Sequence, residues 1–229
     1  MGDIAAEISE QLNVETVFTL HIGNFDIPVF ESTVVGWIVI AIVLIICLIL
    51  GSNLKVKNIS KRQAVAEFIV TKLEDFISGT IGHEGKAYIP YLIAVLLYIG
   101  VSNIIGIFGL KPPTKDLNVT GTLAIMSILL IQIASIRAKG PLGWVKSFAA
   151  PIPVVTPINI LELVIKPLSL CMRLFGNVLG AFVIMELLKS VVPVVLPAVF
   201  SLYFDLFDGL LQAYVFVFLT TLYIKEAIE

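Results

Sequence analysis

The sequence has few charged residues, few histidines and few cysteines. Only 14% of its 229 residues are charged, histidine and cysteine each occur twice, and 58% of the residues are hydrophobic. Such scarcity of charge excludes a soluble domain, whose surface would need far more polar side chains. Cys47 and Cys171 both lie in apolar segments, which favours small buried hydrophobic side chains over a disulfide framework or a thiolate metal site. We therefore expect a polytopic membrane protein.

Several sequence features of other protein classes are also missing. The amino-terminal segment, residues 1–31, contains no Lys or Arg, so it lacks the basic start of a signal or transit peptide. A net charge of -2 and the lack of a basic patch argue against nucleic acid as a partner. We find no repeat of fixed period, no glycine-rich phosphate loop and no clustered metal ligands, and we expect neither a cofactor nor a metal.

Apolar runs predict an all-α membrane domain of about five transmembrane helices. A hydrocarbon core about 30 Å thick requires about 20 apolar residues per helix. We expect spans at residues 33–51, 89–110, 118–137, 157–190 and 194–225, after an external segment at 1–31. The last two spans are longer than an upright crossing needs, so they are expected to form a long tilted hairpin.

Residues 62–81 predict a helix of another kind. At helical spacing its apolar side chains fall on one side, namely Val65, Phe68, Ile69, Leu73, Phe76 and Ile77. Polar side chains fall on the opposite side, namely Glu67, Glu74, Asp75 and Ser78. This pattern is typical of an amphipathic helix that lies in the membrane interface without crossing it.

Basic residues predict the orientation of the chain. They cluster after the first and third spans, at Lys55, Lys57, Lys61 and Arg62 and at Arg137, Lys139 and Lys146. The opposite side has only Lys111, Lys115 and Lys189. Because basic loops stay on the cytoplasmic side, the amino terminus is predicted outside and the carboxyl terminus inside.

An arginine lies in the middle of an apolar segment, and other polar residues share its helix face. A charge there costs roughly 2.5 to 3.5 kcal/mol, so Arg173 must face water or a partner. Intervals of three and four residues place one stripe of polar side chains along this helix, at Glu162, Lys166, Ser169, Arg173 and Asn177. The last helix has a similar series, Asp205, Asp208 and Gln212.

The turn near Val192 predicts the relative depth of these residues. Arg173 and Gln212 lie almost equally far from that turn along the chain, so Gln212 is able to face Arg173 across the hairpin. Three carboxylates lie nearer the outer end, namely Glu186, Asp205 and Asp208, whereas Glu162 and Lys166 lie on the inner side. Since intramembrane charges mark ion pathways by default, the pattern indicates carboxylates leading from outside to a central cation.

Purely structural roles are the alternative for each of these residues. Arg173 and Asp208 would then form a structural salt bridge, and Glu162 with Lys166 an ordinary pair one helical turn apart. Asn103 and Asn177 would only hydrogen-bond neighbouring helices.

Three stretches resemble subunit a of the F-type ATP synthase. Residues 166–177, KPLSLCMRLFGN, resemble the signature around its essential arginine; residues 112–120, PPTKDLNVT, followed by Leu123 and Ala124, resemble its outer loop; and residues 211–216, LQAYVF, resemble its last helix. Together with the order of the spans, the resemblance covers almost the whole chain.

The resemblance implies a stationary ion-channel subunit beside a rotating c-ring. Arg173 would face the ion-binding carboxylate of each passing c subunit and would separate two offset half-channels. Asn177 and Gln212 match positions near the arginine, and Lys166 and Ser169 belong to the same signature. The chain would be non-catalytic by itself, with the c-ring, the peripheral-stalk b subunits and the rest of the ATP synthase as partners. The expected location is the bacterial plasma membrane.

The sequence departs from the family pattern at two positions. Phe182 stands nine residues after the arginine, where members often have a protonatable residue, and Asp205 stands where some relatives have histidine. The outer path would therefore consist of carboxylates without histidine.

Two other functional hypotheses compete with the resemblance. A self-contained secondary ion transporter would use Arg173 and the carboxylates as a mid-membrane site, but such transporters usually have paired repeats, whereas here the polar groups crowd into the last two helices. An assembly scaffold would explain the cost of the buried charges poorly. The transported ion, H+ or Na+, stays open because the resemblance places the selective site on the c subunit.

Overall fold

The computed structural model confirms an all-α polytopic membrane fold. It describes residues 16–22, 25–52, 54–56, 59–82, 85–148, 153–191 and 195–229. Within that part of the chain, five helices are long and apolar enough to cross a bilayer. Lys57 and the turn near Val192, which entered the predictions above, lie outside the described residues.

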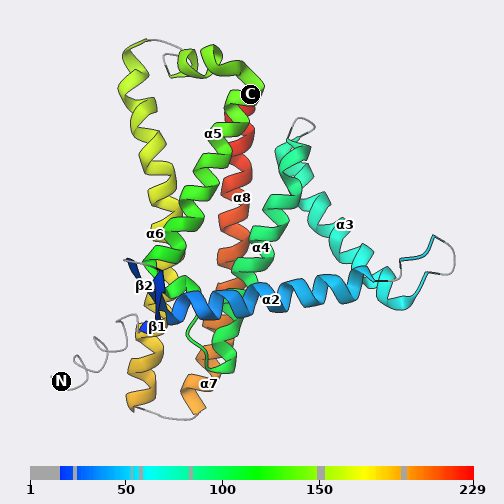
Figure 1. Cartoon of the computed structure of the whole chain (residues 1–229), viewed down its shortest axis with the longest axis vertical. Coiled ribbons are helices and arrows are strands. Elements are labelled where there is room, and N and C mark those ends of the chain that lie inside the picture. The colour runs from blue at the N-terminus through cyan, green and yellow to red at the C-terminus, as the bar shows by residue number, and fades with distance from the viewer. Residues whose placement is uncertain are drawn as a thin grey trace.

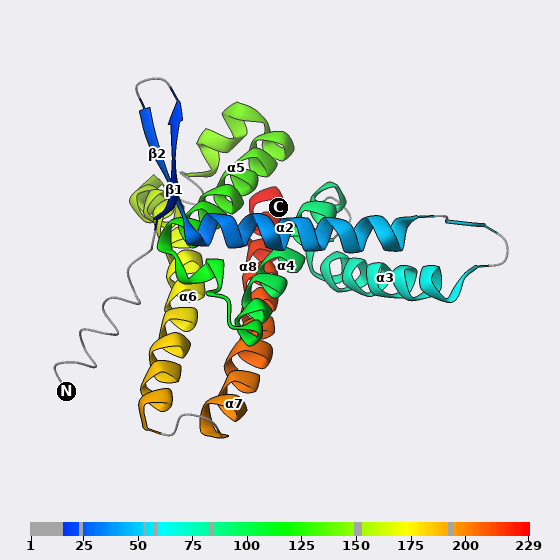
Figure 2. The ribbon, with the colours of Figure 1, turned by 60° about the horizontal axis from the view of Figure 1, so that its bottom comes forward.

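The helices α2 (Glu31–Gly51) and α3 (Lys61–Ile81) follow one another, and Figure 1 shows α3 leaving the far end of α2 at an angle. α2 buries only a short stripe near its start, including Val35 and Val39, and exposes most of its other apolar side chains. α3 begins at Ser60, whose side chain accepts a hydrogen bond from the Gln63 backbone N–H at 3.2 Å. In the view of Figure 2 the chain reverses after α2, and α3 runs back toward the other helices.

The middle of the chain forms α4 (Ile89–Ile104) and α5 (Leu117–Ser147). Short 3₁₀ helices flank α4 at Lys86–Tyr88 and Ile105–Phe108, and another, Pro113–Lys115, precedes α5. Asp116 caps α5 by accepting a hydrogen bond from the Asn118 N–H at 2.9 Å. Gly140 has φ 73° before Pro141, so α5 is two helical pieces joined at a kink.

The carboxyl-terminal half forms the long hairpin. α6 (Thr156–Val191), which follows a 3₁₀ turn at Pro153–Val155, has 36 residues, and at 1.5 Å per residue it is about 54 Å long, well beyond the hydrocarbon thickness. The second arm of this helical hairpin consists of α7 (Val195–Ser201), a π-helix (Leu202–Asp208) and α8 (Gly209–Ile228). α2 crosses α6 and α8 steeply in both Figure 1 and Figure 2. If α2 stands upright in a bilayer, the hairpin is therefore strongly tilted.

α8 lies at the centre of the helix packing. It contacts α3, α4, α5 and α6, and Phe216, Val217 and Ile224 on it are almost completely buried. α6 packs on α5 through Leu170, Cys171 and Leu174, and leaves its other sides less covered. Of the two cysteines, Cys171 is buried as expected, whereas Cys47 is exposed on α2.

An antiparallel β-hairpin precedes α2, which the prediction of a plain external segment did not include. β1 (Thr16–Ile22) pairs with β2 (Phe25–Phe30), and His21 contacts Asp26 across the pair. The sequence signal for it is Gly23-Asn24 between two runs rich in β-branched and aromatic residues.

Two contacts join segments that were both predicted outside. Lys111 Nζ lies 2.9 Å from Glu31 Oε2, and Ser32 Oγ donates to Asp116 Oδ2 at 2.6 Å. The start of α2 and the loop before α5 therefore lie at the same place in the fold, whereas the side of the membrane that they face stays a prediction.

Candidate functional site

Arg173 is an exposed cation in the middle of α6. Neither Arg173 nor Asn177, one turn further on, is covered by other parts of the chain. Among the described residues no carboxylate forms an ion pair with Arg173, so the structural salt bridge with Asp208 is not formed. The guanidinium is thus free to meet a group from outside the chain.

The helix face beside Arg173 is sterically open. A Cβ built on Gly176 or on Gly180 would meet nothing within 4 Å. Gly209 on α8 differs, because a Cβ there would lie 2.7 Å from the Cβ of Asn103. Gly209 is needed for packing inside this chain, whereas Gly176 and Gly180 leave room for a helix of another chain.

Gln212 lies on the buried side of α8. Only 6% of it is exposed, and no hydrogen bond among the described residues joins it to Arg173. The residue count allowed Gln212 to face Arg173, and that placement stays a prediction.

The three outer carboxylates line one cavity. Glu186, Asp205 and Asp208 contribute to a cavity of about 530 Å³, together with Phe182 and Lys111. α6, the end of α4 and the π-helix enclose it. Arg173, Asn177 and Gln212 are not among its lining residues.

The π-helix is a local feature that the hydrophobic pattern did not predict. It includes both Asp205 and Asp208, and such turns are rare and often occur at functional sites. Ser201 Oγ donates to Asp205 Oδ2 at 2.7 Å, and a Cβ on Gly106 would lie 3.0 Å from Asp205 Oδ1. The Asp205 carboxylate is therefore held between α7 and the end of α4.

Asn103 connects α4 to this segment. Its Nδ2 donates to the Gly209 carbonyl at 2.9 Å, and its Oδ1 accepts from Thr114 Oγ1 at 2.6 Å. The prediction that Asn103 hydrogen-bonds a neighbouring helix holds for this residue.

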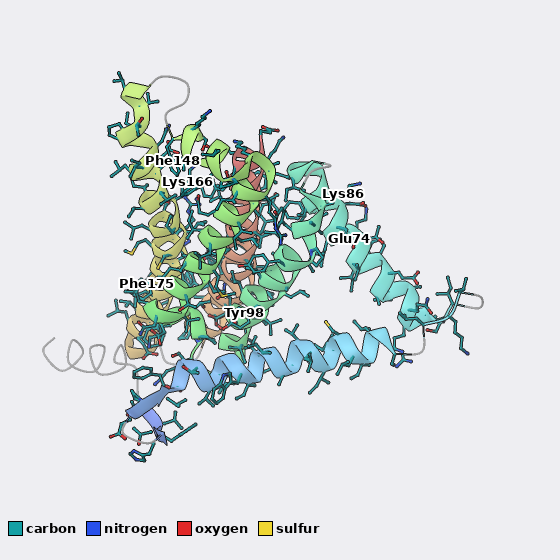
Figure 3. All side chains as sticks on the ribbon, turned by 45° about the horizontal axis from the view of Figure 1, so that its top comes forward. Glu74, Lys86, Tyr98, Phe148, Lys166 and Phe175 are labelled. Carbon is teal, nitrogen blue, oxygen red and sulfur yellow. The ribbon has the colours of Figure 1, made fainter. Side chains whose placement is uncertain are left out.

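A second polar cavity lies at the other end of the hairpin. Its volume is about 270 Å³, and Lys139, Asn159, Glu162, Lys166 and Glu226 are among its lining residues. Lys166 Nζ lies 3.1 Å from Glu162 Oε2 and also 3.1 Å from Glu226 Oε1. The pair of Glu162 with Lys166 is thus formed. Glu226, which the spacing along α6 does not include, joins this pair from α8. Figure 3 labels Lys166 and Phe148 at this end of the molecule.

A third cavity contains none of the residues predicted to move ions. It has a volume of about 600 Å³, lies between α2, α4 and α5, and is lined mainly by apolar and aromatic side chains such as Trp37 and Met126. Figure 3 shows Tyr98, another lining residue, beside α2.

Known proteins match nearly the whole chain. The family model described as ATP synthase A chain matches residues 33–225. The chain is 34% identical over 222 residues to ATP synthase subunit a of Moorella thermoacetica, covering 95% of this chain and 98% of the relative. It is 33% identical over 222 residues to the sodium ion specific ATP synthase subunit a of Propionigenium modestum, covering 90% and 76%.

A third relative has the same description. ATP synthase subunit a of Nitratidesulfovibrio vulgaris (strain DP4) is 33% identical over 228 residues, covering 96% of this chain and 94% of the relative. The matched residues include all five apolar helices over most of their length and the polar stripe of α6. The chain therefore belongs to the ATP synthase subunit a family and is an integral membrane component of that complex.

Proposed function

We propose that this chain is the stationary ion-channel subunit of a rotary ATP synthase, in which ion-binding carboxylates of a c-ring move past Arg173. Arg173 itself carries the proposal. It is an exposed cation within a 36-residue apolar helix and has no ion-pair partner among the described residues. Because an unpaired charge in lipid is costly, a carboxylate from another subunit is its natural partner.

A fixed cation at this point drives ion release. A guanidinium close to a carboxylate favours the ionised form of that carboxylate. A c subunit that arrives at Arg173 therefore gives up its ion, and it takes up another only after it has moved on. Arg173 also opposes a direct leak of cations between the two sides, so ions travel with the rotor.

The cavity of about 530 Å³ is the proposed outer half-channel. Its carboxylates, Glu186, Asp205 and Asp208, can accept and return a proton, and their oxygens suit Na+ equally. The name of one relative includes sodium specificity, so both ions stay within the proposal.

The cavity of about 270 Å³ is the proposed entrance of the inner half-channel. Lys166 and Glu162 line it, and Ser169 follows Lys166 on the same helix one turn before Arg173. The polar stripe of α6 thus leads from this cavity toward the central cation.

The proposed setting follows from the same features. The amino terminus faces the outside and the carboxyl terminus the cytoplasm of a bacterial cell, because the basic residues cluster at 55–62 and 137–146. The chain has no catalytic role of its own and works with the c-ring, the peripheral-stalk b subunits and the rest of the synthase. Cysteines placed at Lys115 and Lys139 should react with an impermeant reagent from outside and from inside, respectively.

A cross-linking experiment tests the proposal. A cysteine at Gly176, in a chain without Cys47 and Cys171, should form a disulfide with a cysteine next to the ion-binding carboxylate of a small two-helix subunit. A cysteine kept only at Cys171, which is buried against α5, is the matched control and should not cross-link. A chain that purifies without such a subunit and transports ions alone would support the secondary transporter instead.

A further inference from the structure

We infer that Asn103 is a positioning residue that holds the π-helix in register and so directs Asp205 and Asp208 into the outer cavity. This inference rests on the proposed outer half-channel. It concerns how the carboxylates come to face that path, which the polar stripe and the family match leave unexplained.

Both ends of the Asn103 amide are occupied. Asn103 is 3% exposed and Thr114 is fully buried, so their hydrogen bonds are shielded from water. One bond reaches the backbone of Gly209, and the other comes from the 3₁₀ turn before α5. The amide therefore has a fixed direction, and its donor side points at α8.

Gly209 is the residue at which the π-helix ends and α8 begins. Its backbone N–H bonds to the Phe204 carbonyl five residues earlier, the spacing that defines a π turn, and also to the Leu206 carbonyl three residues earlier. Such turns are short and rare because their hydrogen bonds are less favourable than those of an α-helix, so an outside contact is well placed to select them. Asn103 supplies that contact at the carbonyl of this same residue.

The 3₁₀ helix that follows α4 contacts the π-helix at a second point, three residues after Asn103. Asn103 lies close to Gly209, and Gly106 lies close to the Asp205 carboxylate. A Cβ built on Gly106 would lie 3.0 Å from Asp205 Oδ1. Asn103, Gly106, Asp205, Asp208 and Gly209 all line the same cavity. The end of α4 and the 3₁₀ helix after it thus pack against the segment that contains both aspartates.

A purely structural role for Asn103 makes a different prediction. If Asn103 only joins two helices, its loss lowers stability and leaves the direction of the side chains before Gly209 unchanged. If it holds the π turn, its loss lets the segment relax to α-helix. Because a π turn holds one residue more than an α turn, the preceding residues would then rotate by up to about 100°, the angle of one residue.

Cysteine accessibility in the assembled complex separates these roles. Single cysteines at positions 203 to 208, in a background without Cys47 and Cys171, are treated in vesicles with a small hydrophilic methanethiosulfonate added on the outer side. In the otherwise unchanged chain, positions 205 and 208 should react fastest. With Asn103→Leu, which has a similar volume and no amide, α8 stays fixed and fast labelling should move from position 205 to position 206, with at least a tenfold fall at 205. Ser102→Ala, buried on the same helix but not bonded to Gly209, should leave the pattern unchanged.

Asn103→Asp tests the hydrogen bond that Asn103 Nδ2 donates to the Gly209 carbonyl. It also replaces the leucine variant if that variant does not assemble. The new carboxylate can still accept from Thr114, but it can donate to the Gly209 carbonyl only when protonated. Labelling at 205 should therefore be lost at neutral pH and return as the outer pH is lowered, relative to the unchanged chain. If cysteines at 205 and 208 react and their labelling is the same with either substitution of Asn103, the positioning role is wrong but the outer half-channel stands. Inert cysteines at both positions in the unchanged chain would overturn the outer half-channel as well.

Discussion

Lys166 of α6 and Glu226 of α8 stand 60 positions apart in sequence, yet Lys166 Nζ donates to both Glu226 carboxylate oxygens at 3.1 Å. The same ammonium lies 3.1 Å from Glu162 on its own helix. One cation therefore joins the two long helices of the hairpin at the end away from their turn. Lys166 also lines the inner cavity and belongs to the polar stripe that leads to Arg173.

This shared cation predicts non-additive stability changes. Glu226→Gln or Glu162→Gln alone should lower the free energy of unfolding by less than about 1 kcal/mol, because the remaining carboxylate keeps the half-exposed pair. Both changes together leave Lys166 unpaired, and the loss should exceed the sum by about 1 kcal/mol. Thermal unfolding of the purified complex measures the cycle. Glu229→Gln, which affects a more exposed pair at 3.9 Å, is the control and should have no measurable effect.

Two glycines of the hairpin should respond in opposite ways to one added methyl group. Gly209→Ala places a Cβ 2.7 Å from that of Asn103, so α4 and α8 must separate, at a cost of about 1 to 3 kcal/mol. Gly176→Ala meets nothing within 4 Å in this chain, and the chain should fold as before. Gly176→Leu should likewise fold but slow ATP-driven pumping, since the open face is proposed to contact the rotor. Equal stability losses at the two positions would contradict the assignment of their surroundings.

The outer carboxylates should share the transport of ions. Asp205→Asn and Glu186→Gln should each reduce the ion flux in vesicles only in part, because the other carboxylates of the cavity still accept and return ions. The two substitutions together should reduce the flux far more than either alone. Glu74→Gln, exposed on α3 and outside that cavity, is a control for changes in charge alone. Full pumping by the double variant would move the outer path elsewhere.

Much of the fold was predictable because membrane helices depend on local sequence. A charge-free run such as residues 33–50 indicates a helix by length alone, since every backbone polar group in lipid must be bonded within its own segment. The pair of Glu162 with Lys166 was predictable for the same reason, as spacing on one helix determines it. Glu186, Asp205 and Asp208 were assigned to the outer half by counting, and they do line a common cavity. Their role in transport stays a prediction.

The features that were not predicted depend on contacts between distant parts of the chain. The π-helix shifts the backbone hydrogen bonds from four to five residues apart, and the residue that follows it accepts a hydrogen bond from Asn103 on a different helix. Glu226 joined Lys166 only because α6 and α8 meet at that depth. The buried position of Gln212 follows from which face of α8 packs inward, and residue counting along the hairpin does not contain that rotation.

ATP-driven ion pumping by the complex with Arg173→Ala tests the central proposal most directly. Pumping is followed in inverted vesicles with a pH-sensitive dye, or with a sodium-sensitive dye if Na+ is the ion, after gel analysis has established that the complex is assembled. We predict that the alanine variant assembles and does not pump, and that Arg173→Lys restores little, because a compact ammonium does not reproduce the planar guanidinium. Pumping at the unchanged rate by the assembled alanine variant would contradict the assignment of Arg173 as the cation that the rotor carboxylates meet.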